Sequence, residues 1–400
     1  MGDLKFEIVK KIAETKFKVR DLSNISKINS FSPPSVFIGS KLKYPEVNVG
    51  ILSPLEKDEN AWLYDDAKYW AENNLEINHV LYLRNNLLNS RFKTKVTDAR
   101  LNKKFLEITK NIAIALKPVD VEIDFKNRVR IGREKDKVLT PMGMSVEIEK
   151  AEISGNVKID ANVDKIINDE IKASEGVEFL YNKNFDEYFL SKVLSVGALG
   201  LKKDKRIVPT RWSITATDDM IAKNLLKEVR EYKWIENFEF FFGEFMGNQY
   251  LILLQPNIWS FELFELYFPG SAWNPSKEIK ASTDYEGFDG RKDYAFSTAG
   301  GYYATRLPIL KYLNLIKRQA SVLVIRIETP SYWASLGVWV VRESVKKALQ
   351  NKMQFASKEE FFESVKKISK IKYNFDLNEI LNKSKLLKQA KEQKNLREFF

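Results

Sequence analysis

Stretches in which hydrophobic and polar residues alternate predict short strands in several parts of the chain. Two runs rich in aromatic and aliphatic residues, 238–242 and 250–254, flank Met246, Gly247 and Asn248, a sequence typical of a β-hairpin turn. The strands predicted in this way are 36–39, 47–52, several within 118–160, 207–217, 238–242, 250–254, 259–268, 321–328 and 336–341.

Longer stretches with helical periodicity separate these strands. They predict helices at 62–116, 162–196, 220–232, 302–318 and 342–350, and a further helix that opens at the capping box 357–360 and continues to about 370. We expect residues 270–300, rich in Gly, Asp, Ser and Lys, to form a loop. The mixture indicates an α/β or α+β fold with a mixed sheet and several long helices, and it leaves the sheet topology open.

The 400 residues are enough for two or three domains, and the pattern divides them into four segments. Residues 1–30 form a charged lead-in that we expect to be loosely helical. Residues 31–365 form a globular body with room for two lobes that divide near residue 200. A basic helical tail, 366–392, and a terminal motif, 393–400, complete the chain.

Composition removes several classes of site. The chain has no Cys and one His, so disulfides, thiol nucleophiles, zinc fingers and iron–sulfur clusters are excluded. Oxygen ligands remain, and these suit Mg²⁺ or Mn²⁺. The N-terminus carries charges where a signal peptide needs an apolar run, and no apolar run is long enough to span a bilayer. We expect an intracellular protein that has no membrane partner.

The formal net charge is +11, and much of it lies near the C-terminal end of the sequence. Between Lys366 and Glu398, ten Lys and Arg residues stand against four Asp and Glu residues, a net charge of +6. One interpretation is a solvated helix face. The other is an electrostatic contact with a polyanion such as DNA.

The sequence ends in Gln-Lys-Asn-Leu-Arg-Glu-Phe-Phe, which resembles the PCNA-interacting motif of sliding-clamp partners. In a 3₁₀ turn, residues three apart share one face, so Gln393, Leu396 and Phe399 align and Phe400 lies beside them. Such an apolar plug fits a hydrophobic pocket on the clamp. The alternative is that the three apolar side chains pack on the chain's own core. We predict that Gln393, Leu396, Phe399 and Phe400 bind PCNA.

A row of hydroxyl residues leads to two adjacent carboxylates in the segment 208–219. On the predicted strand 207–217, alternation places Ser213, Thr215 and Thr217 on one face. The carboxylates of Asp218 and Asp219 follow at a strand-to-helix junction, where ligands gather in open α/β sheets.

This junction predicts a divalent-cation site for Mg²⁺ or Mn²⁺ at Asp218 and Asp219, with Arg211 as a phosphate contact. The alternative is that Thr217 or Asp218 only caps the next helix. The sequence by itself does not choose between the two.

A second segment, 273–306, brings acids, arginines, tyrosines and glycines together. Gly300 and Gly301 would let backbone N–H groups face a phosphate at the start of the next helix. Trp273, Tyr302 and Tyr303 would stack on bases. The alternative is an ordered surface loop with a glycine turn, followed by an amphipathic helix.

Together these segments resemble the archaeal Nre family of DNA-repair proteins. The resemblance is carried by residues 33–39, 45–50, 209–219, 284–287, 300–306 and 336–343, and by the terminal 393–400. It implies a role in surviving DNA damage and a PCNA partner, and it supplies no reaction, so no catalytic residue follows from it. Some relatives have a cysteine-rich N-terminus like a zinc finger, which a chain without Cys does not have.

Two functions remain open. The first is a PCNA-tethered enzyme that acts on damaged DNA, either a nuclease that depends on a divalent metal or a glycosylase. Its candidate catalytic carboxylates are Asp218, Asp219, Glu278, Asp284 and Glu286. Its candidate phosphate and DNA contacts are Arg211, Arg291, Arg306, Gly300, Gly301, Trp273, Tyr302 and Tyr303. The second is a non-enzymatic, PCNA-bound adaptor or damage sensor. In either case we expect a cytoplasmic archaeal protein associated with the nucleoid.

Overall fold

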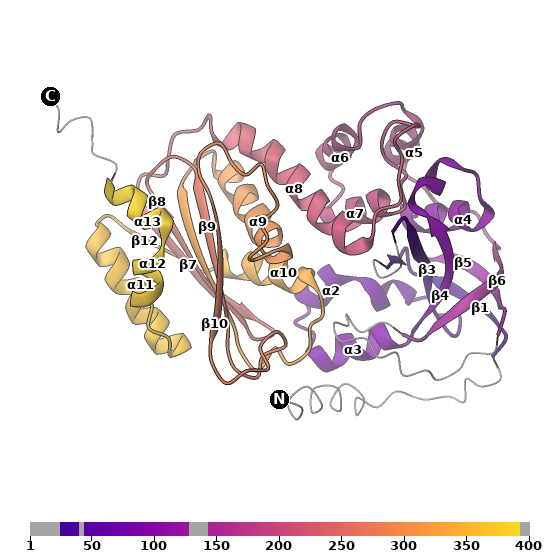
Figure 1. The fold of residues 1–400 in the computed structure, drawn as a ribbon, viewed down its shortest axis with the longest axis horizontal. Helices are drawn as coiled ribbons and strands as arrows, with labels where there is room; N and C mark the ends of the chain where they lie inside the picture. Colours follow the sequence, from indigo (N-terminus) through magenta and orange to yellow (C-terminus); the bar gives the residue numbers. More distant parts are fainter. Residues whose placement is uncertain (1–24, 40–43, 128–142, 393–400) are drawn as a thin grey trace. The chain divides into compact units, whose positions relative to one another are not determined.

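The computed structural model describes residues 25–39, 44–127 and 143–392. These residues form two compact units, one that ends at Ile221 and one that begins at Ala222. We call them the N-terminal and C-terminal units. The boundary lies inside helix α8 (Thr210–Val229), which contributes residues to both (Figure 1).

The N-terminal unit contains a six-stranded mixed sheet in the order β1-β5-β6-β4-β3-β2. Its strands are β1 (Lys27–Ser32), β2 (Val36–Ile38), β3 (Glu46–Pro54), β4 (Leu87–Lys95), β5 (Val119–Phe125) and β6 (Ser145–Ile153). β4 and β6 are parallel and pair only from Asn89–Ser145 to Arg91–Glu147, whereas the other neighbouring strands are antiparallel. Beyond Arg91 the two strands separate, since β4 continues beside β3 and β6 continues beside β5.

Short helices surround this sheet. They are η2 (Ala61–Asp65), α2 (Ala67–Glu72), α3 (Ile77–Asn85), η3 (Val96–Arg100), α4 (Lys104–Ile114), α5 (Ala161–Asn168), α6 (Ala173–Asn182) and α7 (Glu187–Ser195). α4 contacts β2, β3, β6 and α7, and its apolar face, which includes Leu106 and Ile112, is buried. Burial of this face ties the sheet to the helices, because removal of apolar area from water is the main source of stability.

The C-terminal unit contains a second six-stranded sheet, in the order β10-β9-β11-β8-β7-β12. Its strands are β7 (Phe238–Phe245), β8 (Asn248–Gln255), β9 (Ser260–Tyr267), β10 (Lys280–Glu286), β11 (Ser321–Glu328) and β12 (Lys352–Phe355). β9 and β11 are parallel and the remaining pairs are antiparallel. The β7–β8 hairpin turns at Met246 and Gly247, whose φ angles are 49° and 73°, as the turns of two-residue hairpins require.

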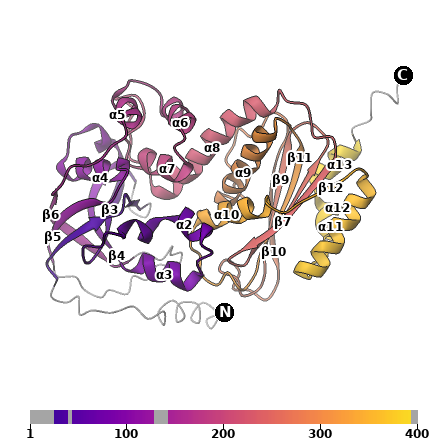
Figure 2. The same ribbon diagram turned by 180° about the vertical axis from the view of Figure 1, so that it is seen from behind.

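Helices cover both faces of this sheet. They are α9 (Gly300–Ile316), α10 (Val338–Ala348), α11 (Lys358–Tyr373), α12 (Asn378–Lys383) and α13 (Lys385–Glu392). α9 and α10 lie on one side and α11–α13 on the other (Figures 1 and 2). The face towards α11–α13 is apolar, with Phe240, Leu253, Phe264 and Ile325 in its core. The opposite face carries most of the buried charged residues of the strands, whereas Glu262 of β9 lies on the side of α13.

This architecture confirms the predicted α/β class with mixed sheets. The β7–β8 hairpin, β9, β11 and α9 lie where the pattern predicted them. The predicted start of α11 is confirmed at its N-cap, because the Ser357 side chain accepts a hydrogen bond from the Glu360 N–H. Local sequence signals were sufficient for these elements.

Two predicted strands are helices. Residues 210–217 belong to α8, whose first turn starts at the carbonyl of Pro209, so Ser213, Thr215 and Thr217 do not line one face of a strand. The hydroxyls of Ser213 and Thr215 bond to backbone carbonyls one turn earlier instead. Residues 338–341 begin α10, since a short apolar run fits a buried helix turn as well as a strand.

Other expectations missed strands. β4 lies inside the region predicted as helix, because its first four residues are all buried and show no alternation. β10 lies inside the predicted loop, and β1 begins within the predicted helical lead-in. Of that lead-in, residues 1–24 lie outside the described residues.

Candidate functional site

The predicted site residues are divided between the two units. Arg211, Asp218 and Asp219 are on the part of α8 that belongs to the N-terminal unit. The predicted residues from Trp273 to Arg306 lie in the C-terminal unit, around β10 and the start of α9.

Asp218 and Asp219 point in different directions, because successive residues on an α-helix are about 100° apart. The Asp218 side chain is fully buried and Asp219 is half-buried, and both interact with neighbouring groups. Within residues 25–39, 44–127 and 143–392, no three His, Asp or Glu side chains are grouped so that they could hold a metal ion. Binding of Mg²⁺ or Mn²⁺ at Asp218 and Asp219 stays a prediction. Arg211 is exposed on the first turn of α8.

Asp284 on β10 organises the loop that connects β10 to α9. Its Oδ2 accepts hydrogen bonds from the backbone N–H and the hydroxyl of Thr298, at 2.8 and 2.9 Å. Its Oδ1 pairs with Arg291 at 3.0 Å. The Arg291 guanidinium also donates to the backbone carbonyls of Tyr285, Asp293 and Tyr294, each at 3.1 Å. These contacts connect the two ends of the loop.

Glu286 forms a fully buried ion pair with Arg306 of α9. The Arg306 Nε lies 2.7 Å from the Glu286 Oε1, and the two side chains are 2% and 0% exposed. The indole N–H of Trp259 donates to the same oxygen at 3.0 Å. Glu286 Oε2 and the Tyr302 hydroxyl are buried, and neither has a hydrogen-bond partner in the described part of the chain. Burial raises the pKa of Tyr302 far above its usual value, and the nearby Glu286 carboxylate raises it further, so this phenol keeps its proton.

A carboxylate of the chain itself lies at the glycine pair that starts α9. A β-carbon at Gly301 would collide with the Glu265 carboxylate of β9. Just before it, Ala299 has φ 44° and ψ −125°, a conformation rare for a residue with a β-carbon. Gly301 is therefore required for close approach of α9 to Glu265. A phosphate at Gly300 and Gly301 stays a prediction.

Glu265 belongs to a row of buried charges that the sequence analysis missed. Arg326 of β11 lies 2.5 Å from Glu265 Oε1 and 2.9 Å from Glu328 Oε2. The same guanidinium donates to the side-chain carbonyl of Asn248 at 2.7 and 3.0 Å. Tyr267 donates to Glu265 Oε2 at 2.6 Å. Burial raises the pKa of Glu328, and the Arg326 charge opposes this shift.

A sequence signal for this row did exist. Glu265 interrupts the apolar run of β9, and Arg326 interrupts that of β11. Burial of a charged residue inside an apolar strand is costly unless the charge is paired. Two residues of opposite charge in two apolar strands therefore indicate that the strands are neighbours and that the residues form an ion pair. Their pairing needed the parallel register, in which Glu265 lies opposite Arg326.

The predicted stacking residues differ in exposure. Tyr302 and Tyr303 are 1% and 6% exposed, so their rings are covered within the C-terminal unit. Trp273 is 47% exposed and has ring area available for a base. The carboxylate-bearing Glu278 is also exposed. In the loop, Phe296 is 80% exposed and lies edge-on to Tyr294, another aromatic site that the sequence analysis did not single out.

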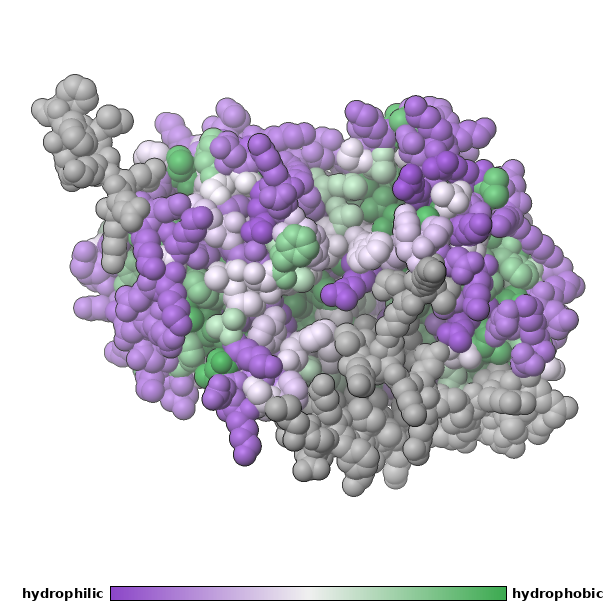
Figure 3. Space-filling view, in the orientation of Figure 1, coloured by the Kyte–Doolittle hydropathy of each residue, from purple (hydrophilic) through white to green (hydrophobic). Residues whose placement is uncertain are grey.

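The tail helices are basic on one side and apolar on the other. All seven lysines from 366 to 388 are exposed, and hydrophilic residues dominate the visible surface over α11–α13 (Figure 3). Leu386 and Leu387 of α13 are buried against the sheet. Gln393, Leu396, Phe399 and Phe400 lie outside the described residues.

Glu262 of β9 anchors the start of α13. Its carboxylate accepts hydrogen bonds from the Ser384 hydroxyl at 2.5 Å and from the N–H groups of Lys385 and Leu386 at 3.0 Å. Negative charge at a helix N-terminus is stabilising. The last helix is therefore fastened to the sheet by a buried carboxylate and two leucines.

Comparison with known proteins identifies the family. The model of the N-terminal part of archaeal Nre matches residues 1–274, and the model of its C-terminal part matches residues 286–399. The chain belongs to the archaeal Nre family. The first Nre model ends in the loop before β10 and the second begins at Glu286, the last residue of β10, whereas the compact units divide inside α8.

Curated relatives extend over most of this Nre chain. It is 39% identical to DNA repair protein NreA of Haloferax volcanii, over 84% of this chain and 81% of the relative. It is 39% identical to NreA of Archaeoglobus fulgidus over 86% and 84%, and 33% identical to NreB of the same organism over 92% and 90%. No solved structure matches the chain. None of the helices in the described ranges is both long enough and apolar enough to cross a membrane.

Proposed function

We propose that this Nre chain is a DNA-repair protein that binds PCNA through residues 393–400 and contacts damaged DNA with its folded body. Three relatives from two archaea carry the name DNA repair protein. The motif Gln393, Leu396, Phe399 and Phe400 has the spacing of a clamp-binding plug. Association with the nucleoid follows from binding a clamp that encircles DNA.

The observation that carries this proposal is the anchoring of α13. Glu262 holds the start of this helix on β9, so the last described helix before the motif is fixed to the C-terminal unit. A motif joined to a fixed helix holds the folded body close to the clamp and to its DNA at high effective concentration. The exposed lysines of α11–α13 then lie near an acidic clamp rim or near DNA.

Surface plasmon resonance with immobilised archaeal PCNA tests the tether. Deletion of residues 393–400 is expected to abolish binding while the thermal unfolding curve of the body stays the same. Phe399→Ala is expected to weaken binding at least about tenfold, as loss of an interface hot spot does. Asn395→Ala is the matched control, since residue 395 lies off the shared face of the motif. Undiminished binding by the deletion variant would show that the tail does not bind PCNA.

The geometry favours a binding role over hydrolysis for β10 and the α9 start. Asp284 and Glu286 each face an arginine, and each accepts a further hydrogen bond within the C-terminal unit. Carboxylates held in this way stabilise the β10–α9 loop and the start of α9, and so position the exposed residues there for binding a partner. We therefore place the adaptor or damage sensor first, and the nuclease or glycosylase second.

A panel of lesion-bearing and branched DNAs, incubated with Mg²⁺ or Mn²⁺, separates these two functions. Asp218→Asn/Asp219→Asn and Asp284→Asn are compared with the parent chain, with urea unfolding as the check on folding. Turnover that these changes abolish would favour the hydrolase. DNA and PCNA binding without turnover on any substrate is the result expected of the adaptor.

A further inference from the structure

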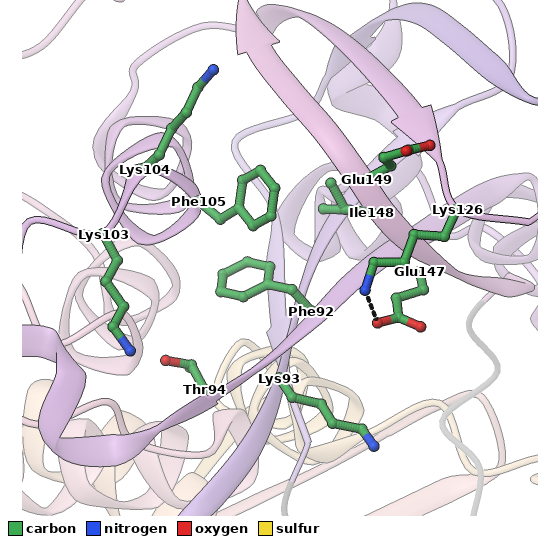
Figure 4. A pocket seen from close by; sticks show the side chains of 10 residues that line it. All are labelled: Phe92, Lys93, Thr94, Lys103, Lys104, Phe105, Lys126, Glu147, Ile148 and Glu149. Atoms are coloured by element: carbon green, nitrogen blue, oxygen red, sulfur yellow. Dashed lines mark hydrogen bonds and ion pairs between the residues drawn. The ribbon is translucent and has the colours of Figure 1, made fainter.

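A pocket of about 420 Å³ opens in the N-terminal unit where β4 and β6 separate (Figure 4). β4 and β6 are parallel, and both run towards this gap after the pair Arg91–Glu147. α4 begins beside it, with Lys103 at its N-cap and Phe105 in its first turn. The lining residues of both strands lie at or just beyond the last parallel pair, and the place where neighbouring strands of an α/β sheet diverge is a frequent ligand site.

Two phenylalanines form the middle of the pocket. The ring centroids of Phe92 and Phe105 lie 5.4 Å apart, and the rings are tilted by 53°. Both side chains are half-buried, so part of each ring is open to a ligand. Figure 4 shows the two rings facing each other between the α4 side and the β6 side of the pocket. Aromatic rings in such a position are suited to stacking on a nucleic-acid base.

Lysines lie on both sides of these rings, whereas both carboxylates of the pocket lie on the β6 side, where Glu147 pairs with Lys126. Lys103 and Lys104 lie on the α4 side, and Glu147 and Glu149 lie on β6 (Figure 4). Three lysines of the pocket make ion pairs, Lys103 with Asp98, Lys104 with Glu152 and Lys126 with Glu147. These lysine side chains are 51–60% exposed. The Lys104 and Lys126 pairs are exposed on both sides and contribute little, so a phosphate can replace the carboxylate. Asp98 is buried, and the half-exposed Lys103 ammonium can donate to a phosphate while it stays paired with Asp98.

Lys93 and Glu149 are different, because neither makes an ion pair in the described part of the chain. Glu149 is the extra residue of a β-bulge, since Asp124 pairs with Lys150 and Phe125 with Ile148. A bulge turns a side chain out of the regular alternation, and bulges are frequent beside binding sites. In Figure 4 the Glu149 carboxylate lies beyond Ile148, at the edge of the pocket.

We propose that this pocket binds one nucleotide unit of single-stranded DNA. The base lies against Phe92 and Phe105, its exocyclic amino group donates to the Glu149 carboxylate, and the adjoining phosphates contact Lys103 and Lys104. Cytosine offers an N4 amino donor to a carboxylate, whereas thymine presents an O4 acceptor there. The pocket therefore binds cytosine in preference to thymine. This inference rests on the proposed function, which makes DNA the partner.

Fluorescence anisotropy of the full chain with labelled oligo(dC) and oligo(dT) of equal length tests the base preference. We expect oligo(dC) to bind about threefold more tightly, as one hydrogen bond to a base edge allows. Glu149→Gln is expected to remove the preference, because an amide can donate to thymine as well as accept from cytosine. Glu178→Gln, an exposed carboxylate on α6, is the matched control and keeps it.

The stacking and phosphate contacts have separate variants. Phe105→Leu keeps an apolar side chain and is expected to weaken binding about tenfold through loss of stacking. Lys103→Gln/Lys104→Gln is expected to lower the slope of log affinity against log salt by about 0.7 per lysine. Lys203→Gln, an exposed lysine outside the pocket, leaves affinity and slope as in the parent chain.

Three results would overturn the pocket assignment. The parent chain and Glu149→Gln could both bind oligo(dC) and oligo(dT) with equal affinity, and this result would contradict the proposed contact between Glu149 and the base. An affinity of Phe105→Leu for oligo(dC) equal to that of the parent chain would contradict the proposed stacking contact. Free dCMP could also displace the labelled oligo(dC) as effectively as unlabelled oligo(dC) does at the same total nucleotide concentration. That result would assign the pocket to a mononucleotide instead of single-stranded DNA.

Measurement of PCNA binding by every pocket variant, beside its binding of oligo(dC), separates a failure of this inference from a failure of the proposed function. Variants that bind PCNA normally and oligo(dC) weakly support the pocket. Variants that bind both normally reject the pocket and leave the proposed function in place. A parent chain that binds PCNA without any affinity for single-stranded DNA rejects the pocket and the DNA contact, and leaves the clamp tether.

Discussion

The pairs Glu286–Arg306 and Glu147–Lys126 have nearly the same N–O distance in opposite surroundings. Their N–O distances are 2.7 and 2.6 Å. In the C-terminal unit the two side chains are 0% and 2% exposed, whereas in the N-terminal unit both are 51% exposed. The distance between the charges therefore does not determine the role of an ion pair. The degree of burial does, because the strength of the interaction depends on the surrounding dielectric.

Burial makes the first pair structural and exposure makes the second pair exchangeable. A buried charge that loses its partner cannot recover hydration, so Glu286 and Arg306 depend on each other. Water screens the exposed pair and replaces either partner at little cost. The C-terminal unit thus uses charges to hold β10 and α9, and the N-terminal unit keeps charges available at the pocket between β4 and β6.

The largest effect is expected from Arg306→Met. The change keeps much of the side-chain volume and leaves the Glu286 carboxylate buried without its cation, so the free energy of unfolding should fall by about 3–5 kcal/mol. Urea unfolding followed by circular dichroism measures the loss. A fall below about 1 kcal/mol, the range of exposed pairs, would remove the contrast between the two pairs.

A double variant separates the lost pair from the stranded charge. In Arg306→Met/Glu286→Gln the glutamine is neutral and its carbonyl can still accept from the Trp259 indole N–H. We expect the double variant to be more stable than Arg306→Met alone, because no unpaired charge remains. Equal or lower stability of the double variant would show that the stranded carboxylate is not the cause.

The next effect is expected from Gly301→Ala. The new methyl group would meet the Glu265 carboxylate, which Arg326 and Tyr267 hold in place, and the strain should cost about 1–3 kcal/mol. Differential scanning calorimetry would detect the lower melting temperature. Gly287→Ala is the control, since its β-carbon would make only an ordinary contact with the Tyr285 hydroxyl. Equal stability of both variants would contradict a tight fit at Gly301.

A smaller effect depends on pH and lies beside the N-terminal pocket. Burial acts to raise the pKa of Asp98, but hydrogen bonds from Lys103, Thr94 and the Lys95 N–H outweigh it and lower the pKa from 3.8 to about 2. A carboxyl whose pKa is lower in the folded state contributes stability above the unfolded value and loses it as pH falls from about 4 to 2.

Asp98→Asn is therefore expected to be less stable than the parent chain at pH 7, by about 1–2 kcal/mol. The difference should shrink as pH falls through 4 and should nearly vanish at pH 2, as chemical unfolding at each pH would show. Asp204→Asn, an exposed residue of the same unit, is the control. A difference that stays constant with pH would exclude the proposed ionisation.

The smallest effect is expected from Lys126→Gln. Because its pair with Glu147 is exposed, the free energy of unfolding should change by less than about 0.5 kcal/mol. Urea unfolding under the conditions used for Arg306→Met allows a direct comparison. A loss above about 2 kcal/mol would mean that the exposed pair is structural, and the distinction between the units would fail.

Sequence patterns predicted the elements whose signals are local. The turn at Met246 and Gly247, the cap at Ser357 and the alternation of β5 depend on neighbouring residues, so the chain itself reveals them. The segment 210–217 failed because hydroxyl and β-branched residues suggest a strand, while a helix beginning at Pro209 satisfies their hydroxyls through the preceding turn. Tertiary context overrode propensity there.

The candidate site divides in the same way. Asp284, Glu286, Arg291 and Arg306 were predicted as a polar group near one loop, and the structure brings them together as two ion pairs. The separate pair Glu265–Arg326 was missed, because these two residues meet only through the register of β9 and β11. Residues far apart in sequence leave no local pattern that reveals such a pairing.

The sequence by itself determined the absence of cysteine ligands, the positive charge of the tail and its terminal motif, and the order of most strands and helices. Only the tertiary structure decided which charges are buried in pairs, which helix terminus faces a carboxylate, and where parallel strands separate to leave a pocket. The physical reason is the separation in sequence over which each kind of interaction acts. Composition and periodicity act between neighbours, whereas burial and pairing depend on contacts between strands and helices that the chain brings together only when it folds.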